Sequence, residues 1–283
     1  MSLLSAEFKA FGTRCEVRFM PSKRYSSIVI FEELVSECQR IERKYSKFIS
    51  NSLVSQINHA AGTKETFRLD DETALLIDFA LSAYQESDGL FDITFGSDKS
   101  ITRTKQDMAI SFKDLYWNKP YLKLPIKGMK IDFGGFGKEY AIDRVYKLVK
   151  SLGVESGLIN FGGDIGIIGS SYSGDPWKVG IKDPDKENLV LHNIYVNNGF
   201  LATSGTYERV IMIDNQPFSH IINPECRTPI LNQVGITCYD EMTCLSAGFH
   251  STTAILKGDD SERWLKNRNI KSFILSGGNV RIV

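Results

Sequence analysis

The chain has 283 residues, of which 42% are hydrophobic and 24% are charged, as in ordinary globular proteins and unlike disordered or fibrous chains. Lysine plus arginine and aspartate plus glutamate both number 34, so the formal net charge is zero and the basic excess typical of nucleic-acid binding is missing. No apolar run approaches the roughly 20 residues that span a membrane. We therefore predict no nucleic-acid partner and no membrane span.

The five cysteines are odd in number and form no Cys-x-x-Cys pair, which argues against a disulfide framework or a cysteine zinc site. We expect free thiols in a reducing compartment. The first residues lack a basic segment followed by a long apolar core, so the sequence as written predicts a cytoplasmic protein. Removal of an N-terminal signal would instead make it an exported or membrane-anchored protein.

The first half of the chain contains strand and helix patterns. Residues 8–20 alternate around Gly12 and indicate a strand. Apolar residues at three- and four-residue spacing predict amphipathic helices over 26–45 and 71–86. Residues 97–130 are polar and poorly periodic and predict a loop. Two short strands are predicted inside that loop, at 121–124 and 129–132.

The second half mixes both kinds of element. A helix is predicted over 138–152, with Gly153 at a position where helices commonly end. Helices and strands show no regular βαβ alternation, so we predict an α+β fold in a single domain, 1–283, with two packed halves. The remaining predicted helices are 246–257 and 260–268, and the predicted strands are 157–161, 165–168, 177–182, 189–196, 208–213, 217–222, 233–239 and 272–276.

The densest motif runs from Asp132 to Asp143, with the sequence DFGGFGKEYAID. An extended segment enters a glycine-rich turn and a helix starts at once, which lets a ligand approach the backbone and offers free N–H groups to phosphate. Lys138 in the first turn can meet a phosphate as a point charge. The alternative is a tight strand-to-helix turn without a ligand.

Two further turns are weaker signals. Asn160–Asp164 places two glycines between apolar strands, and taken alone it is better explained as a bulge or hairpin turn without a ligand. Ala202–Arg209 offers hydroxyl groups and a flexible backbone, but hydroxyl-rich turns are common.

His220 is the histidine whose sequence context suggests chemistry, because it lies between Phe218 and the Asn223-Pro224 turn. It can act as a general acid or base near neutral pH, or it can be a strand histidine bonded to the backbone. Asp88 and Asp92 lie after the second helix. One can bond backbone N–H groups and the other a ligand, and Asx-turn chemistry is the structural alternative.

The order of the motifs is more specific than any one of them. In chain order they are Phe11–Thr13, Tyr45–Phe48, Asn51-Ser52, Ile57-Asn58, Asp88–Thr94, Asp132–Asp143, Asn160–Asp164, Ala202–Gly205, Ser219–Pro224 and Thr252. Together these motifs resemble the ApbE family from about residue 8 to 276. The resemblance implies an α+β, T-fold-related architecture and transfer of FMN from FAD to a threonine hydroxyl of a target flavoprotein, with Mg²⁺ and release of AMP.

The resemblance also implies roles for single residues. Aromatic faces at matched positions can stack on isoalloxazine or adenine. Asp132 can accept hydrogen bonds from adenine or ribose, Lys138 suits the pyrophosphate, and His220 is the candidate base. The matched flavin-dinucleotide contacts are Phe11, Phe48, Leu90, Phe91, Asp92, Asp132, Lys138 and Ile222.

The implied magnesium ligands show one departure from the family pattern. The carbonyl ligand matches Gly135 and the threonine ligand matches Thr252, with Ser251 at a position where some members carry a second acid. The family's aspartate ligand, however, matches Gly248. Magnesium prefers charged oxygen ligands, so this site should bind it weakly, unless Asp240 or Glu241 replaces the missing carboxylate.

Two smaller departures are a short 97–130 segment, which bears on acceptor recognition, and Asn223 in place of a more usual aspartate. Three functions therefore remain open. They are FMN transfer, FAD binding with catalysis impaired by Gly248, and FAD hydrolysis to FMN and AMP.

Overall fold

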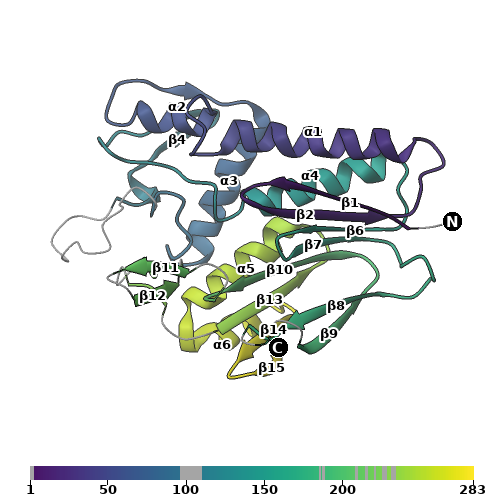
Figure 1. Ribbon diagram of the computed structural model, residues 1–283. Helices are drawn as coiled ribbons and strands as arrows, with labels where there is room; N and C mark the ends of the chain where they lie inside the picture. The colour runs from purple at the N-terminus through teal and green to yellow at the C-terminus, as the bar shows by residue number, and fades with distance from the viewer. Residues whose placement is uncertain are drawn as a thin grey trace. The chain divides into compact units, whose positions relative to one another are not determined.

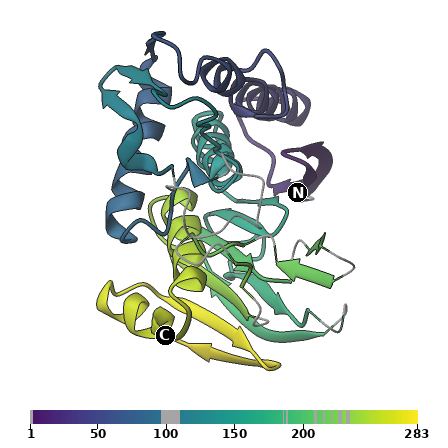
Figure 2. The same ribbon diagram turned by 90° about the vertical axis from the view of Figure 1, so that its left-hand side faces the viewer.

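A computed structural model of the chain describes residues 3–95, 110–184, 186, 189–207, 210–213, 216–219, 221–224, 228–230 and 234–283. The chain divides into two compact units. The first comprises Met1–Arg40, Phe136–Ile221 and Ile230–Val283, and the second comprises Ile41–Gly135 and Ile222–Pro229. Helices accompany several sheets, so the predicted α+β class is confirmed (Figures 1 and 2).

The first unit is built on an eight-stranded sheet in which hydrogen-bonded neighbours are antiparallel. Its order is β1-β2-β6-β7-β10-β13-β14-β15. The strands are β1 (Leu4–Ala10), β2 (Thr13–Phe19), β6 (Gly157–Phe161), β7 (Asp164–Ile168), β10 (Gly199–Gly205), β13 (Val234–Asp240), β14 (Ser272–Ser276) and β15 (Asn279–Ile282).

Two helices of the first unit, α4 (Gly137–Ser151) and α5 (Cys244–Leu256), pack against each other and against this sheet. They lie side by side in Figures 1 and 2. Helix α4 contacts β6 and β7, whereas α5 contacts β7, β10 and β13. Because α5 is apolar or small around most of its circumference, it is almost wholly buried. The short η3 (Gly258–Asp260) and α6 (Ser261–Asn267) follow it.

Strand alternation assigns the two faces of the sheet. Ile165, Ile167 and Leu201 pack into an apolar cluster with the hairpin of β8 (Trp177–Lys182) and β9 (Val190–Val196). The alternate residues face the helices, because a side chain added at Gly166 would lie 3.0 Å from Ile142 of α4. A separate pair joins β11 (Val210–Ile213) to β12 (Gln216–Ser219).

In the second unit, the three-stranded sheet β3-β5-β4 accompanies α2 (Leu53–His59) and α3 (Asp71–Glu86). The Asp70 carboxylate accepts a hydrogen bond from Thr73 N and caps α3, while Ser52 caps α2 in the same way. The other elements are β3 (Phe67–Arg68), β4 (Tyr116–Asn118), β5 (Tyr121–Lys123) and η2 (Phe112–Asp114).

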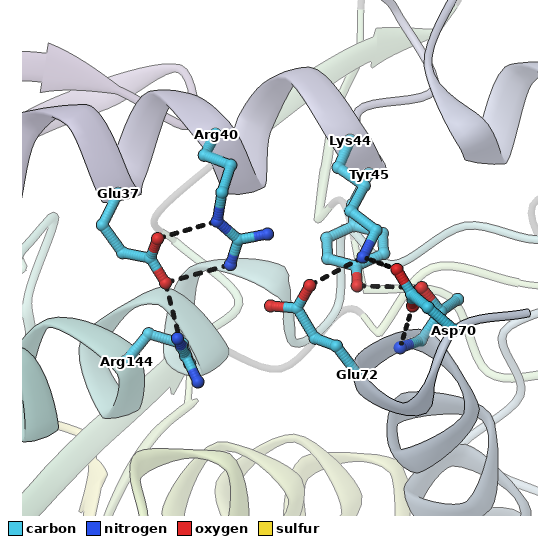
Figure 3. Close-up of polar contacts among 8 residues, drawn as sticks. Glu37, Arg40, Lys44, Tyr45, Asp70, Glu72 and Arg144 are labelled. Atoms are coloured by element: carbon cyan, nitrogen blue, oxygen red, sulfur yellow. Dashed lines mark hydrogen bonds and ion pairs between the residues drawn. The ribbon is translucent and has the colours of Figure 1, made fainter.

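Helix α1 (Ser27–Tyr45) carries one polar cluster in each unit (Figure 3). In the first unit, the Glu37 carboxylate accepts hydrogen bonds from Arg40 at 2.7 and 2.9 Å and from Arg144 at 2.9 Å. In the second, Lys44 donates to the carboxylates of Asp70 and Glu72 at 2.6 and 2.7 Å. The first cluster ties α1 to α4, and the second ties α1 to the start of α3.

The structure corrects three predicted elements. Residues 8–20 form a hairpin and not one strand, because Phe11 and Gly12 take left-handed φ angles of 54° and 67° between β1 and β2. Residues 202–205 belong to β10 and not to a flexible turn, and 129–132 form no strand. Helix α2 and strand β15 were not predicted, and residues 97–109 of the predicted loop lie outside the described residues.

Candidate functional site

The turn at Asn160–Asp164 joins β6 to β7, so the prediction of a hairpin turn is confirmed. Gly162 and Gly163 have φ angles of 61° and 102°, and Asn160 Oδ1 accepts a hydrogen bond from Gly163 N at 2.9 Å. The turn leaves Asp164 as the first residue of β7, at 1% exposure. It therefore delivers a buried carboxylate to the helix-facing side of the sheet.

Asp164 is the acidic partner of Lys138. Lys138 Nζ forms an ion pair with Asp164 Oδ2, and Asp164 Oδ1 accepts a hydrogen bond from Thr203 N at 2.9 Å. Lys138 lies in the first turn of α4, as predicted, and its side chain is 19% exposed. This lysine is thus positioned by a fixed carboxylate, with part of its surface still accessible.

Glu139 follows Lys138 and points into the interior between α4 and α5. It is 8% exposed, and its Oε2 atom is buried without a hydrogen-bond partner among the described residues. Burial raises the pKa of the Glu139 carboxyl well above its ordinary value, the Asp164 carboxylate raises it further, and Lys138 lowers it. A β-carbon added at Gly248 of α5 would lie 2.8 Å from Glu139 Cγ.

A row of hydroxyl groups links β10 to α5. Ser204 Oγ lies 2.8 Å from Ser251 Oγ and 2.9 Å from Thr252 Oγ1, and Ser251 donates to the Gly248 carbonyl at 3.1 Å. Each hydroxyl has one proton. With Ser251 donating to the Gly248 carbonyl, the arrangement that satisfies all three contacts has Ser204 donating to Ser251 and Thr252 donating to Ser204. The Thr252 oxygen is left with lone pairs to accept from, or coordinate, a ligand.

Asp143 fixes the start of α5 relative to α4. Its carboxylate oxygens accept hydrogen bonds from Cys244 N at 2.6 Å and Leu245 N at 3.1 Å. Burial raises the pKa of Asp143 to about 7, against the opposing effect of these two N–H groups. Because Asp143 and Glu139 both belong to α4, the contact also sets where Glu139 meets α5.

In the second unit, Asp132 forms one side of a polar cluster. Its Oδ1 accepts a hydrogen bond from Gly134 N at 2.8 Å, and its Oδ2 pairs with Lys47 at 2.5 Å. The Lys47 ammonium lies 5.2 Å from the ring centroid of Phe48, which is 86% exposed. A large aromatic ring this open to solvent is available to stack on a planar ligand.

The Asp92 carboxylate accepts hydrogen bonds from neighbouring residues of the second unit. The donors are Thr94 N and Thr94 Oγ1, both at 2.7 Å, and Phe112 N at 3.1 Å. Burial raises the pKa of Asp92 despite these donors. Leu90 and Phe91 are buried, and a side chain added at Gly135 would lie 3.8 Å from the Phe91 ring. Contact of Leu90, Phe91 and Asp92 with a flavin stays a prediction.

The structure also describes Phe11 and Ile222, two further predicted flavin contacts. Phe11 occupies the β1–β2 turn and stacks on Phe161 at a centroid distance of 6.2 Å. Ile222 forms an isolated antiparallel bridge with Pro229. His220, the predicted base, lies outside the described residues, as does Cys226. The other four cysteines are buried free thiols, in line with the expectation from their number.

The described part of the chain contains no helix long and apolar enough to cross a membrane. Nor do its His, Cys, Asp and Glu side chains form a group of three or more suited to a metal ion. A cation site formed by these described residues would therefore draw also on hydroxyl, carbonyl or substrate oxygens.

The fold and the site together define a class. It comprises α+β proteins in which glycine-rich turns place a lysine, carboxylates and hydroxyl groups beside two packed helices, here α4 and α5. The family model described as the ApbE family matches residues 11–274, and the chain belongs to the ApbE family.

Known relatives agree with this assignment. The FAD:protein FMN transferase of Buchnera aphidicola is 27% identical over 88% of this chain and 78% of its own length, and that of Escherichia coli K12 is 23% identical over 93% and 80%. The crystal structure of the ApbE protein from Thermotoga maritima superposes with a TM-score of 0.86 at 26% identity, covering 100% of this chain and 96% of the other. The flavin transferase ApbE from Vibrio cholerae, at 20% identity and a TM-score of 0.85 over 100% and 97%, shares the fold.

Glu139, Asp164 and Ser204 were not among the predicted site residues. All three lie inside motifs singled out in the sequence, so the motifs themselves were the available signal. What the sequence could not provide was the pairing of Glu139 with Gly248, which are far apart in the chain and meet only through the packing of α4 on α5.

Proposed function

We propose that the protein is an FAD:protein FMN transferase, which moves FMN from FAD to a threonine hydroxyl of a target flavoprotein and releases AMP. The observation that carries the proposal is the group formed by Lys138, Asp164 and the Thr252–Ser204–Ser251 hydroxyl row on α4, α5 and the sheet. It combines a cation for phosphate with oxygens for a metal. The relatives that bear this activity in their names add independent support.

In this proposal the chain's residues bind and orient the dinucleotide. The Lys138 ammonium faces the diphosphate as a point charge, held in place by Asp164. The exposed Phe48 ring stacks on a planar ring of FAD, and Asp132 accepts hydrogen bonds from adenine or ribose. Phe11, Leu90, Phe91, Asp92 and Ile222 are the remaining proposed flavin contacts, as the family resemblance implies.

The reaction replaces the phosphoanhydride bond of FAD with a phosphoester bond to the acceptor threonine. The acceptor threonine oxygen forms a bond to the FMN-side phosphorus, and the bond from that phosphorus to the bridging oxygen breaks, so that AMP leaves with the oxygen. The threonine proton passes to a base, for which His220 is the proposed residue. Orientation of the two reactants supplies much of the rate in such transfers.

Magnesium belongs to the proposal as a bound cation that neutralises charge on the phosphoryl oxygens. The Thr252 hydroxyl suits the role of a metal ligand, because it donates its proton to Ser204 and keeps lone pairs on its oxygen. Ser251 donates its proton to the Gly248 carbonyl, so it suits the role of positioning Ser204 better than the role of a metal ligand.

A second candidate is FAD binding with impaired catalysis. The observation that favours it is the lack of a carboxylate at position 248. FAD hydrolysis without an acceptor is a third outcome that one assay can identify.

The assay measures AMP released from FAD by the purified chain, with Mg²⁺ or EDTA, and with or without a flavoprotein that carries an acceptor threonine. Release that needs both Mg²⁺ and the acceptor is the result expected for the transferase. Release without the acceptor would identify a hydrolase, and tight FAD retention without any AMP would identify a binding protein. Either of these two results would refute FMN transfer.

A further inference from the structure

We propose that Glu139 supplies the metal-ligating carboxylate that the chain lacks at Gly248, so that α4 and α5 together hold Mg²⁺ through Glu139 and Thr252. The inference deepens the proposed function and rests on it for the substrate, whose phosphate oxygens would complete the coordination. The two residues themselves belong to one unit of the structure.

The first argument is space. A β-carbon built on Gly248 would lie 2.8 Å from Glu139 Cγ and 3.2 Å from Glu139 Oε1. Real β-carbons essentially never approach another heavy atom to 2.8 Å, and 3.2 Å is also an unusually tight contact. The Glu139 side chain therefore fills the volume into which a carboxylate from position 248 would project. With glycine at position 248, this volume still contains one carboxylate, and it comes from Glu139 of α4 instead of from α5.

The second argument is the position of this volume on α5. Gly248 and Thr252 are four residues apart, so they lie one turn apart on the same face of the helix. The hydroxyl row ends at Thr252 with an oxygen that can still accept, and the row is anchored on the Gly248 carbonyl through Ser251. A carboxylate beside Gly248 and the Thr252 oxygen thus border the same stretch of α5.

The third argument is the state of the Glu139 carboxylate itself. Oε2 is buried and has no hydrogen-bond partner among the described residues, which is costly for a polar atom. Fully ionised, Glu139 and Asp164 carry two negative charges against the single positive charge of Lys138. A bound divalent cation would satisfy the unpartnered oxygen and offset the uncompensated charge.

The available donors select the kind of cation. Carboxylate, hydroxyl and phosphate oxygens suit Mg²⁺ or Mn²⁺, whereas zinc sites use histidine and cysteine. Of the two carboxylates considered from the sequence, Asp240 already accepts hydrogen bonds from Met242 N at 2.7 Å and Thr243 N at 3.0 Å. Glu241 is exposed. Neither has the buried, unpartnered oxygen that Glu139 has.

The test is direct metal binding. The metal-stripped full chain is titrated with Mn²⁺, free Mn²⁺ is counted by electron paramagnetic resonance, and bound Mn²⁺ is displaced with Mg²⁺, with and without FAD. The proposal expects one displaceable Mn²⁺ per chain and a Kd at least about tenfold higher in Glu139→Gln. The matched control is Thr253→Val, which removes another buried oxygen that lacks a partner among the described residues, also on α5. It should bind Mn²⁺ like the parent.

A second variant guards against misfolding of the first. Glu139→Ala combined with Gly248→Asp returns the carboxylate to α5, and it should recover Mn²⁺ binding to within about tenfold of the parent. The proposal is overturned if the parent binds no Mn²⁺ under either condition, or if Glu139→Gln binds as the parent does. It is also overturned if the double variant folds but fails to bind. Metal binding that depends on Glu139 without AMP release would instead refute the transferase, and Mg²⁺-dependent AMP release that Glu139→Gln leaves intact would refute this ligand alone.

Discussion

Replacing Gly248 by aspartate should destabilise the protein, although the exchange introduces the carboxylate that the family resemblance implies at this position. The new β-carbon would meet Glu139 Cγ at 2.8 Å, and the new carboxylate would join those of Glu139 and Asp164 in a buried space. Overpacking of this kind costs about 1–3 kcal/mol, offset by somewhat less than about 1 kcal/mol from removing a helical glycine. Repulsion among the carboxylates adds to the cost.

We therefore expect Gly248→Asp to lower the free energy of unfolding by about 2 kcal/mol or more, without metal and at neutral pH. Gly248→Ala isolates the steric part and should cost less. In a Glu139→Ala background the steric conflict is absent, so Gly248→Asp should cost less than about 0.5 kcal/mol there.

Urea denaturation of the four proteins in the cycle, followed by circular dichroism, gives the coupling between positions 139 and 248. A coupling of at least about 1.5 kcal/mol is the expected result. Additivity within about 0.5 kcal/mol would show that the two positions do not share the same volume, and the argument from space would fail.

Three other predictions follow from the polar contacts. Arg40 and Arg144 lower the pKa of Glu37 below its ordinary value of 4.5, so its contribution to stability is present above that pH and is lost as the pH falls through the folded-state pKa. Glu37→Gln should lower the free energy of unfolding by about 1 kcal/mol at pH 7, with the difference vanishing in acid; a difference independent of pH would contradict this. Lys138→Met should reduce AMP release at least about tenfold in the FAD assay, and unchanged release would exclude a diphosphate contact. Phe48→Ala should raise the Kd for FAD about tenfold with little change in stability, because the ring is 86% exposed; equal affinity would remove Phe48 from the binding surface.

Periodicity predicted the helices well, because α1, α3 and α4 each bury one apolar stripe. It failed at β10, where the Thr203, Ser204 and Gly205 pattern is typical of a turn. In the folded chain, Thr203 bonds Thr237 on the neighbouring strand, and Ser204 bonds Ser251 and Thr252 on the helix side. Tertiary partners for the hydroxyl groups therefore override local propensity.

Some residues of the candidate site could likewise be predicted from the sequence, and others could not. The glycine-rich turns and Lys138 could be predicted, because backbone freedom and a helix start are local properties. The family resemblance also predicted that position 248 lacks a carboxylate ligand, and this stays a prediction. It did not identify Glu139 as its neighbour, because that pairing depends on how α4 and α5 pack, and Asp143 sets the packing by binding the first N–H groups of α5.

The most direct test of the account is a crystal structure of the protein with FAD and Mg²⁺. The account predicts that the diphosphate contacts Lys138 Nζ and that the metal ion contacts both a Glu139 carboxylate oxygen and Thr252 Oγ1. A structure with FAD bound elsewhere, or with a diphosphate that approaches neither α4 nor α5, would contradict it.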